Sequence, residues 1–318
     1  AGREDINRLD RQIGDYYENI FHWYRQAMEK ASFSHLIRPV HPAYYFEQSS
    51  PEAATEELSF THSMIRIDPF LDFWKKDSPA RDELARAVDT DPDGPASWRE
   101  FLTRLFDVAA ENGAAGIKQL QAYTRSLDFM PRPDDSSVRF RGDLDPDQVH
   151  TFQNWVMHEC CKQAHQRRWP HQVHVGTHNL SESFPLPLGQ LASQYGQMDI
   201  VQLHCWPFIE QAGWLAKHHA NCYIDTCWQP VLSPRFFEKA MQTWLNYVPS
   251  HKFMCSQDST SVEMAVGSAL FVREILAEVL VEVTRNMGFS RRDLLRLARN
   301  ILHNNAVEVY RIGSHIEE

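Results

Sequence analysis

Short runs of apolar and β-branched residues recur along the whole chain, and longer helical patterns separate them. Strands that alternate with helices predict βαβ units and a parallel sheet. A doubly wound sheet would normally carry a glycine-rich first turn, and no GxGxxG pattern occurs in the 318 residues. We therefore predict an α/β fold of the (β/α)8 TIM-barrel type.

The predicted strands number seven, and the polar, aromatic-striped stretch before them predicts a helix over residues 5–31. These strands are His35–Val40, Ser63–Ile67, Ala115–Leu120, Gln172–Gly176, Ile200–Cys205, Cys222–Thr226 and Phe253–Ser256. Because a barrel of this type has eight strands, we expect that its first strand is lacking in this chain. We divide the chain into an N-terminal helical segment, residues 1–34, and a barrel, residues 35–318.

The overall composition excludes several classes of protein. The 32 basic and 42 acidic residues give a formal net charge of -10, and a nucleic-acid-binding protein is normally basic, so we expect no nucleic-acid partner. No apolar run approaches the roughly 18 residues of a membrane span, and the first residues lack the apolar core of a secretory signal. Six cysteines without a CxxC pair are typical of reduced thiols in a cytoplasmic protein.

Three of the predicted strands lead into side chains suited to metal binding. His174 lies on the opposite side of its strand from Val173, so it can point into the barrel mouth while the valine packs. Another apolar run ends at His204, and a third leads to Asp258. Catalytic groups of a barrel come from the carboxyl ends of its strands. Two imidazoles and one carboxylate form a ligand set for Zn²⁺, Mn²⁺ or Fe²⁺.

A histidine at a strand end also has an ordinary structural explanation, because many such residues are hydrogen-bonded surface or core residues. The sequence contains 16 histidines, however, and three suitable side chains fall at the ends of three different strands. This coincidence favours a functional site over three unrelated structural residues.

Six segments carry a further likeness through their order and spacing. They are Gly116–Leu127 (GIKQLQAYTRSL), Gln172–Gly176 (QVHVG), Val201–Phe208 (VQLHCWPF), Lys252–Ser259 (KFMCSQDS), Ala269–Leu280 (ALFVREILAEVL) and Ile301–Ile312 (ILHNNAVEVYRI). Together they resemble the metal-dependent amidohydrolase superfamily, in its amidohydrolase-related branch. The resemblance is to the barrel fused to glutamine synthetase in some fungal and plant proteins, and more distantly to uronate isomerases.

The resemblance implies roles for the three strand-end residues. In that family the metal is bound by a His-x-His pair on strand one, a histidine ending strand five and an aspartate ending strand eight. A histidine ending strand six binds a second metal or acts on the substrate. His174, His204 and Asp258 then correspond to strands five, six and eight. No His-x-His pair occurs in this sequence, which agrees with the expectation that strand one is lacking.

The chemistry expected from this arrangement is activation of a water by the metal, with Asp258 accepting its proton and His204 stabilising the oxyanion or donating to the leaving group. Lys118, Tyr123 and Arg125 are the candidate substrate-binding residues. In many relatives a lysine at the position of Lys118 is carbamylated and bridges two metals, whereas in this branch a charge contact is expected. Arg125 can clamp a substrate carboxylate, although a solvent-facing arginine would give the same pattern.

We predict a metal-dependent hydrolase acting on a C–N or C–O bond of a small, carboxylated substrate, with one divalent ion, Zn²⁺ ahead of Mn²⁺ or Fe²⁺. The same ligand set supports a decarboxylase or a uronate-type isomerase. Such an isomerase is expected to have an arginine next to the strand-eight aspartate, and here Ser259 and Thr260 follow. A non-catalytic barrel that serves as an interaction module stays an alternative. Relatives commonly form homo-oligomers, so a homo-oligomer is also expected.

Two polar segments have competing interpretations. Residues Asp89–Glu100 match the calcium-loop pattern D-x-D-x-D-G-x₅-E, but two prolines interrupt the loop. We therefore predict an acidic turn followed by a helix that Ser97 caps. The stretch Met130–Asp147 follows a predicted strand, so it either covers the site or forms an inert surface insertion.

Overall fold

The computed structural model describes residues 2–46, 60–285 and 287–313. In these residues seven strands form one sheet, and every strand runs parallel to its neighbours in the order of the sequence. The strands are β1 (Leu36–Val40), β2 (Thr61–Arg66), β3 (Ala114–Gln119), β4 (His171–Gly176), β5 (Ile200–Trp206), β6 (Cys222–Asp225) and β7 (Phe253–Met254). The seven predicted strands are thereby confirmed, with ends that differ by at most two residues.

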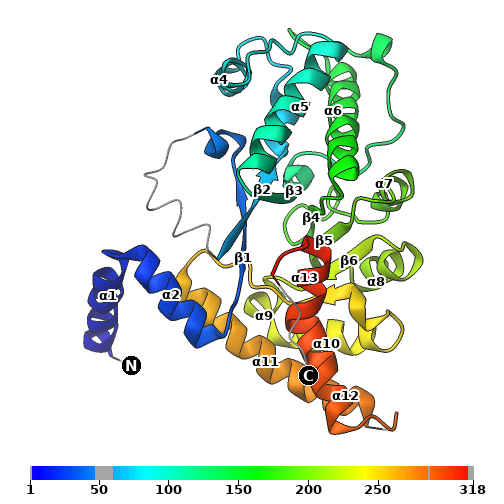
Figure 1. The fold of residues 1–318 in the computed structure, drawn as a ribbon. Helices are drawn as coiled ribbons and strands as arrows, with labels where there is room; N and C mark the ends of the chain where they lie inside the picture. Colours follow the sequence, from blue (N-terminus) through cyan, green and yellow to red (C-terminus); the bar gives the residue numbers. More distant parts are fainter. Residues whose placement is uncertain (1, 47–59, 286, 314–318) are drawn as a thin grey trace.

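Helices α4 to α10 connect the strands from β2 to β7, whereas α1 and α2 precede β1 and α11 to α13 follow β7 (Figure 1). The helices are α1 (Arg3–Tyr17), α2 (Ile20–Ala31), α4 (Pro79–Ala87), α5 (Pro95–Glu111), α6 (Pro146–Arg167), α7 (Leu188–Gln194), α8 (Ile209–His218), α9 (Gln229–Leu232), α10 (Pro234–Leu245), α11 (Val262–Thr284), α12 (Arg291–Arg299) and α13 (Asn305–Tyr310). A parallel sheet requires such crossovers, and their regular succession gives the predicted TIM-barrel architecture. Strands β1 and β7 form the two edges, and within the described residues they are not paired with each other.

The strand residues alternate between an outer and an inner environment, as expected for a pleated sheet. On β4, Val173 and Val175 belong to the large outer core with residues of α5 and α6, whereas Gln172 points inward and donates a hydrogen bond to the Tyr310 hydroxyl (2.8 Å). The end of α13 thus fills the interior of the sheet. Arg311 follows it and pairs with Asp199 (3.2 Å), just before β5, so this segment lies at the edge where the strands begin.

The N-terminal region differs from the prediction of one helix over residues 5–31. It forms two helices, because Asn19 leaves helical geometry and its side chain caps α2 by accepting a hydrogen bond from the His22 amide (3.1 Å). Helix α2 packs against α11, where the Trp23 indole donates to Glu263 (2.8 Å). The division of the chain at residues 34 and 35 stays a prediction.

The segment Asp89–Glu100 forms an acidic turn, as predicted, but the helix after it begins differently. The N-cap of α5 is Gly94, and Ser97 lies in the first turn, where its hydroxyl accepts a hydrogen bond from the Gly94 amide (3.1 Å). The prediction of Ser97 as the cap is therefore wrong. Glu100 does not reach back to the turn and instead forms an ion pair with Arg104 (2.6 Å).

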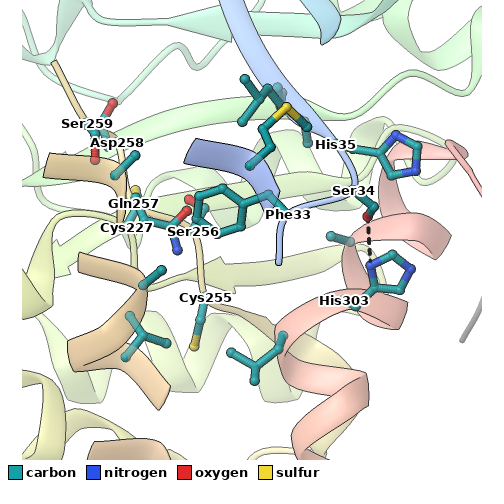
Figure 2. Close-up of a pocket in the computed structure, with 18 of the residues that line it drawn as sticks. Phe33, Ser34, His35, Cys227, Cys255, Ser256, Gln257, Asp258, Ser259 and His303 are labelled. Atoms are coloured by element: carbon teal, nitrogen blue, oxygen red, sulfur yellow. Dashed lines mark hydrogen bonds between the residues drawn. The ribbon is translucent and has the colours of Figure 1, made fainter. Parts of the chain in front are cut away.

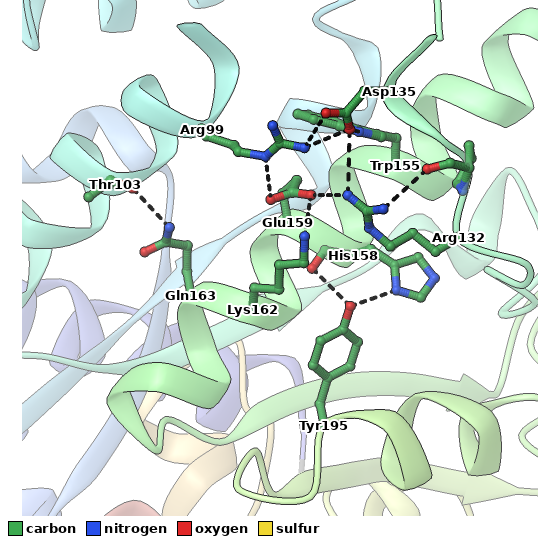
Figure 3. Close-up of polar contacts among 11 residues, drawn as sticks. Arg99, Thr103, Arg132, Asp135, Trp155, His158, Glu159, Lys162, Gln163 and Tyr195 are labelled. Carbon is green, nitrogen blue, oxygen red and sulfur yellow. Dashed lines mark hydrogen bonds and ion pairs between the residues drawn. The ribbon is translucent and has the colours of Figure 1, made fainter. Parts of the chain in front are cut away.

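Residues of the polar loop after β3 lie against the outer helices α5 and α6 (Figure 3). Its Asp135 pairs with Arg99 of α5 (2.6 Å) and accepts a hydrogen bond from the Trp155 indole of α6 (2.9 Å). Its Arg132 pairs with Glu159 of α6 (2.8 Å). The Arg99 hydrogen bond is the main reason that the pKa of Asp135 falls to about 2. These contacts support the surface insertion.

Among the described residues, no helix combines the length and the apolar composition that crossing a bilayer requires.

The first residue of β4 has an unusual environment. His171 is fully buried, and within the described residues neither of its ring nitrogens has a hydrogen-bond partner. Burial, assisted by the nearby Lys118 charge, lowers the pKa of His171 to about 3. Below about pH 6.5 the unfolded chain therefore binds a proton on His171 that the folded protein does not bind.

We expect this difference to make the protein less stable in mild acid. Between pH 7 and pH 5, the wild type should lose about 2 kcal/mol more of its free energy of unfolding than His171→Leu, which has no proton to gain. Urea unfolding of both proteins at the two pH values measures the difference. The same pH dependence in both proteins would contradict the expectation.

Candidate active site

The carboxyl ends of strands β4 to β7 bring together the side chains that define the site. His174 lies near the end of β4, and His204 lies near the end of β5. Asp225 is the last residue of β6, Cys227 follows two residues later, and Asp258 lies four residues after β7. Because the strands are parallel, residues that are distant in the sequence reach the same end of the sheet.

His204 faces the site only because the backbone of β5 departs from a regular strand. Leu203 lines the interior cavity, so a regular strand would turn the next side chain outward. Instead, His204 has a positive φ of 65°, and the pairing of β4 with β5 shifts register at this point. The imidazole is almost fully buried and stands 4.5 Å from the ring of His174, measured between centroids.

Three different donor atoms converge here. One ligand atom of each of His204, Cys227 and Asp258 lies within 4.8 Å of the other two. The His204 Nε2 and the Asp258 Oδ2 are 3.6 Å apart. The His204 Nδ1 lies 3.1 Å from the Cys227 carbonyl oxygen, which can only accept, so Nδ1 carries the proton. The Nε2 lone pair therefore faces Asp258. One nitrogen, one sulfur and one oxygen donor at this spacing fit a divalent transition metal.

Left-handed backbone conformations gather around these donors. Nine residues other than glycine have positive φ in the described chain, and five of them lie at the site. The five are Thr177, His204, Cys205, Trp228 and Asp258. Such conformations cost of the order of 1–3 kcal/mol each and are concentrated at functional sites in proteins. The strain supports a functional role for this edge of the sheet.

A buried carboxylate holds two of the loops in place. The Asp225 Oδ1 accepts hydrogen bonds from the Cys227 amide (3.0 Å), the Ser256 amide (3.0 Å) and the Ser256 hydroxyl (2.9 Å). Its burial raises the pKa of Asp225, and the Ser256 and Cys227 hydrogen bonds oppose that change. Asp225 thereby fixes the loop after β6 to the loop after β7, which leads to Asp258.

His174 is adjacent to the donor set, but its Nε2 is already engaged. It lies 3.0 Å from the Gly176 carbonyl oxygen and 2.8 Å from the Thr177 hydroxyl. The structure thus brings together His204 and Asp258 of the predicted ligands, with Cys227 as the third donor in place of His174. The role of His174 as a ligand stays a prediction. Burial is the main reason that the pKa values of both His174 and His204 fall to about 3.

Aromatic rings surround the imidazoles on the side of the solvent. Tyr123, which is partly exposed, lies 4.7 Å from His174 and 4.8 Å from His178 between ring centroids. The Trp228 ring stacks on His178 at 5.7 Å and lies 5.9 Å from His204. Tyr123 therefore lies beside the two imidazoles, and its contact with a substrate stays a prediction.

A cavity of about 770 Å³ adjoins the site and lies between the edge strands β1 and β7. Figure 2 shows Cys227, Ser256 and Asp258 on one side of it, with Phe33 and His303 among the residues that line its other parts. Such a volume lies within the range of small-molecule sites.

Lys118 of β3 lines the same cavity and is almost fully buried. Burial lowers the pKa of Lys118, and the nearby acidic groups of Cys227 and Asp258 oppose that change. An anionic group in the cavity would provide the buried ammonium with a counter-charge.

Arg125 does not reach the cavity. Its guanidinium is buried and stacks on the Phe129 ring at 4.1 Å, and it donates hydrogen bonds to the Asp128 carbonyl (2.5 Å) and the Asn154 side chain (3.1 Å). These contacts hold the segment after β3 against α6. The predicted contact of Arg125 with a substrate therefore has no support in this geometry.

Sequence reasoning missed Asp225, Cys227 and Trp228. The signal that could have indicated the first two is their position, because a carboxylate and a thiol follow the predicted strand Cys222–Thr226 in the same way that Asp258 follows the next one. Cysteine is among the most buried residue types, so a thiol after a strand does not by itself indicate a site.

Comparison with known proteins supports the fold. No family model matches the chain, and no curated protein matches its sequence significantly. A protein described as a metal-dependent hydrolase from Lactobacillus casei has a similar structure, with a TM-score of 0.67 and 16% identity over 91% of this chain and 77% of that chain. Uronate isomerase from Thermotoga maritima has a TM-score of 0.72 and 14% identity over 90% of this chain and 69% of that chain. Glucuronate isomerase from Caulobacter crescentus has a TM-score of 0.68 and 15% identity over 91% of this chain and 66% of that chain.

At these identities the likeness shows a shared fold. Two of these neighbours are isomerases of the uronate type that the sequence resembles, and membership of the amidohydrolase superfamily stays a prediction. The nearer likeness to the barrel fused to glutamine synthetase has no support in these neighbours and stays a prediction.

Gly176 offers a test of the backbone at this edge. Its φ is 73°, and a Cβ there would lie 1.9 Å from the Trp206 carbonyl oxygen. We expect Gly176→Ala to lower the free energy of unfolding by about 2 kcal/mol or more, because strain and a clash with backbone combine. Gly196→Ala is the control, since a Cβ at Gly196 meets nothing within 4 Å. Urea midpoints that are equal for the two variants would show that the close approach of β4 and β5 is not required.

Proposed function

We propose that this protein is a metal-dependent hydrolase that cleaves a C–N or C–O bond of a small, carboxylated substrate. The observation that carries the proposal is the convergence of His204, Cys227 and Asp258 at the carboxyl end of the sheet, beside a cavity large enough for a small molecule. The fold shared with a metal-dependent hydrolase supports this class of activity. We propose one divalent ion, Zn²⁺ ahead of Mn²⁺ or Fe²⁺.

The residues of the site have separate tasks in this proposal. When bound, the divalent ion supplies Lewis acidity that activates water and polarises the scissile group. His204 presents its Nε2 lone pair and is held in that tautomer by the Cys227 carbonyl oxygen. Asp258 is half-exposed, with 49% of its side chain accessible, so one of its oxygens can accept a proton from water while the other faces His204.

Substrate binding is assigned to Lys118 and Tyr123. The buried Lys118 ammonium lines the cavity with Asp258 and provides a positive charge for a substrate carboxylate. The ring of Tyr123 lies against His174 and is 42% exposed, so it can contact the substrate at the mouth of the site. A lysine that is charged in this buried position favours an anionic partner over a neutral one, because a buried charge is stable only when it is paired.

An isomerase that works with the same donors is the second candidate, because two of the structural neighbours are sugar-acid isomerases. Ser259 and Thr260 beside Asp258 provide no charged group for such a reaction, which favours hydrolysis. Hydrolysis incorporates an oxygen of water into the product acid or alcohol, whereas isomerisation gives a product of the same mass as the substrate.

The experiment combines metal content with turnover of small carboxylated amides and lactones. We expect about one equivalent of bound Zn²⁺. Asp258→Asn should lower kcat at least about 100-fold, because the variant has no group to accept the proton. Product masses from reactions in ¹⁸O-labelled water distinguish hydrolysis from isomerisation.

Asp134→Asn, which removes an exposed carboxylate on the outer loop, is the matched control and should leave both values unchanged. A folded wild type that binds no divalent metal would contradict the proposal and would favour a non-catalytic interaction module.

A further inference from the structure

Cys227 differs from the other cysteines in the groups that surround its sulfur. All six cysteines are unpaired and buried. Within the described residues, Cys227 is the cysteine whose sulfur joins a histidine and a carboxylate at metal-ligand spacing. It is only 1% exposed, and it lines the cavity together with Asp258. A thiol that reaches a cavity beside two other donors is placed differently from a thiol in a packed core.

We propose that Cys227 is a metal ligand, so that the ion is held by sulfur, nitrogen and oxygen from the ends of β6, β5 and the loop after β7. This inference rests on the proposed function, because it specifies the donor set of the metal on which that function depends.

The distances support this donor set. In a tetrahedral zinc site with bonds of about 2.0–2.3 Å, ligand atoms stand roughly 3.3–3.8 Å apart. The His204 Nε2 and Asp258 Oδ2 are already 3.6 Å apart, and a ring nitrogen of His204, the Cys227 sulfur and an Asp258 oxygen lie within 4.8 Å of one another. The sulfur lies 3.3 Å from Nδ1, so the Cys227 side chain or the imidazole must rotate to place it beside Nε2, and the thiol proton would leave to solvent as the bond to the metal forms.

The backbone holds Cys227 where this bond requires it. Its amide donates to the buried Asp225 carboxylate (3.0 Å), and its carbonyl oxygen accepts from the His204 Nδ1 (3.1 Å). One peptide segment therefore orients the histidine ligand and presents its own sulfur at the same time. Partners of this kind, which orient metal ligands from behind, are a regular feature of metal sites.

A different chemistry for the same residues is less consistent with the geometry. The Cys227 sulfur lies 3.3 Å from the His204 Nδ1, which resembles a cysteine nucleophile beside a histidine base. However, Nδ1 carries the proton that it donates to the Cys227 carbonyl oxygen, so it has no lone pair to accept the thiol proton. The lone pair is on Nε2, and that atom faces Asp258.

A thiolate ligand has a consequence for the choice of metal. Soft sulfur donors favour Zn²⁺ and Co²⁺ over Mg²⁺ and Mn²⁺, which prefer oxygen ligands. Three protein ligands leave the fourth position of a tetrahedral ion open, as in catalytic zinc sites. Because both Cys227 and Asp258 line the cavity, that position would be accessible from the cavity.

The test is optical spectroscopy of the full chain loaded with Co²⁺ alone, which requires no substrate. We expect the wild type to show the d–d bands of bound Co²⁺ and a thiolate-to-cobalt charge-transfer band in the near ultraviolet. Cys227→Ser should lose the charge-transfer band, and its Zn²⁺ affinity should fall at least about tenfold, the lower end of the effect of losing outer partners. Cys255→Ser is the matched control, because Cys255 lines the same cavity outside the donor set, and it should keep both.

The outcomes separate this inference from the proposed function. Bound Co²⁺ without a charge-transfer band in the wild type would overturn the thiolate ligand and leave a metal-dependent hydrolase intact. A wild type that binds neither Co²⁺ nor Zn²⁺ would overturn both. If Cys227→Ser does not fold, the test is X-ray absorption of two Zn²⁺-loaded proteins, the wild type and Cys255→Ser. A sulfur neighbour at about 2.3 Å in both supports the inference, and its absence overturns it.

Discussion

The site depends on one buried carboxylate, that of Asp225 at the end of β6. It accepts hydrogen bonds from the amides of Cys227 and Ser256 and from the Ser256 hydroxyl. A charge this deep in a protein is strongly unfavourable unless such donors surround it, so the loops after β6 and β7 must stay where they provide them. Because these loops carry Cys227 and Asp258, the requirement to satisfy one buried group sets the spacing of two donors that face His204.

The sheet contributes the second constraint, because parallel strands deliver their last residues to a common edge. That arrangement alone would turn His204 away, since Leu203 before it already faces the interior. A left-handed residue and a shift in register reverse the direction of the side chain. At the end where the strands begin, Tyr310 and Arg311 close the interior of the sheet. The open end is therefore the carboxyl end of the strands, where the polar side chains gather.

The sequence was sufficient to predict the seven strands, because each is a short apolar run, too short for a helix, between longer helical patterns. The closeness of His204 and Asp258 followed from the same argument, since both come after such runs. Cys227 was not identified, because burial and metal ligation place the same demand on a cysteine and only the three-dimensional neighbours distinguish them. Arg125 is the opposite case, a residue that the sequence predicts to contact a substrate and that contacts the protein itself in the structure. Its fork of donors suits a carboxylate, yet carbonyl and amide oxygens of the chain itself engage it.

The left-handed residues at the strand ends have an implication for the history of such a chain. Thr177, His204 and Asp258 hold backbone angles that glycine would adopt at far lower cost. A lineage that had abandoned the chemistry could therefore become more robust simply by placing glycine or asparagine at these points. Descendants that retain bulky side chains there would be under selection for what those side chains do, whereas drift towards glycine would mark a barrel kept only as a scaffold.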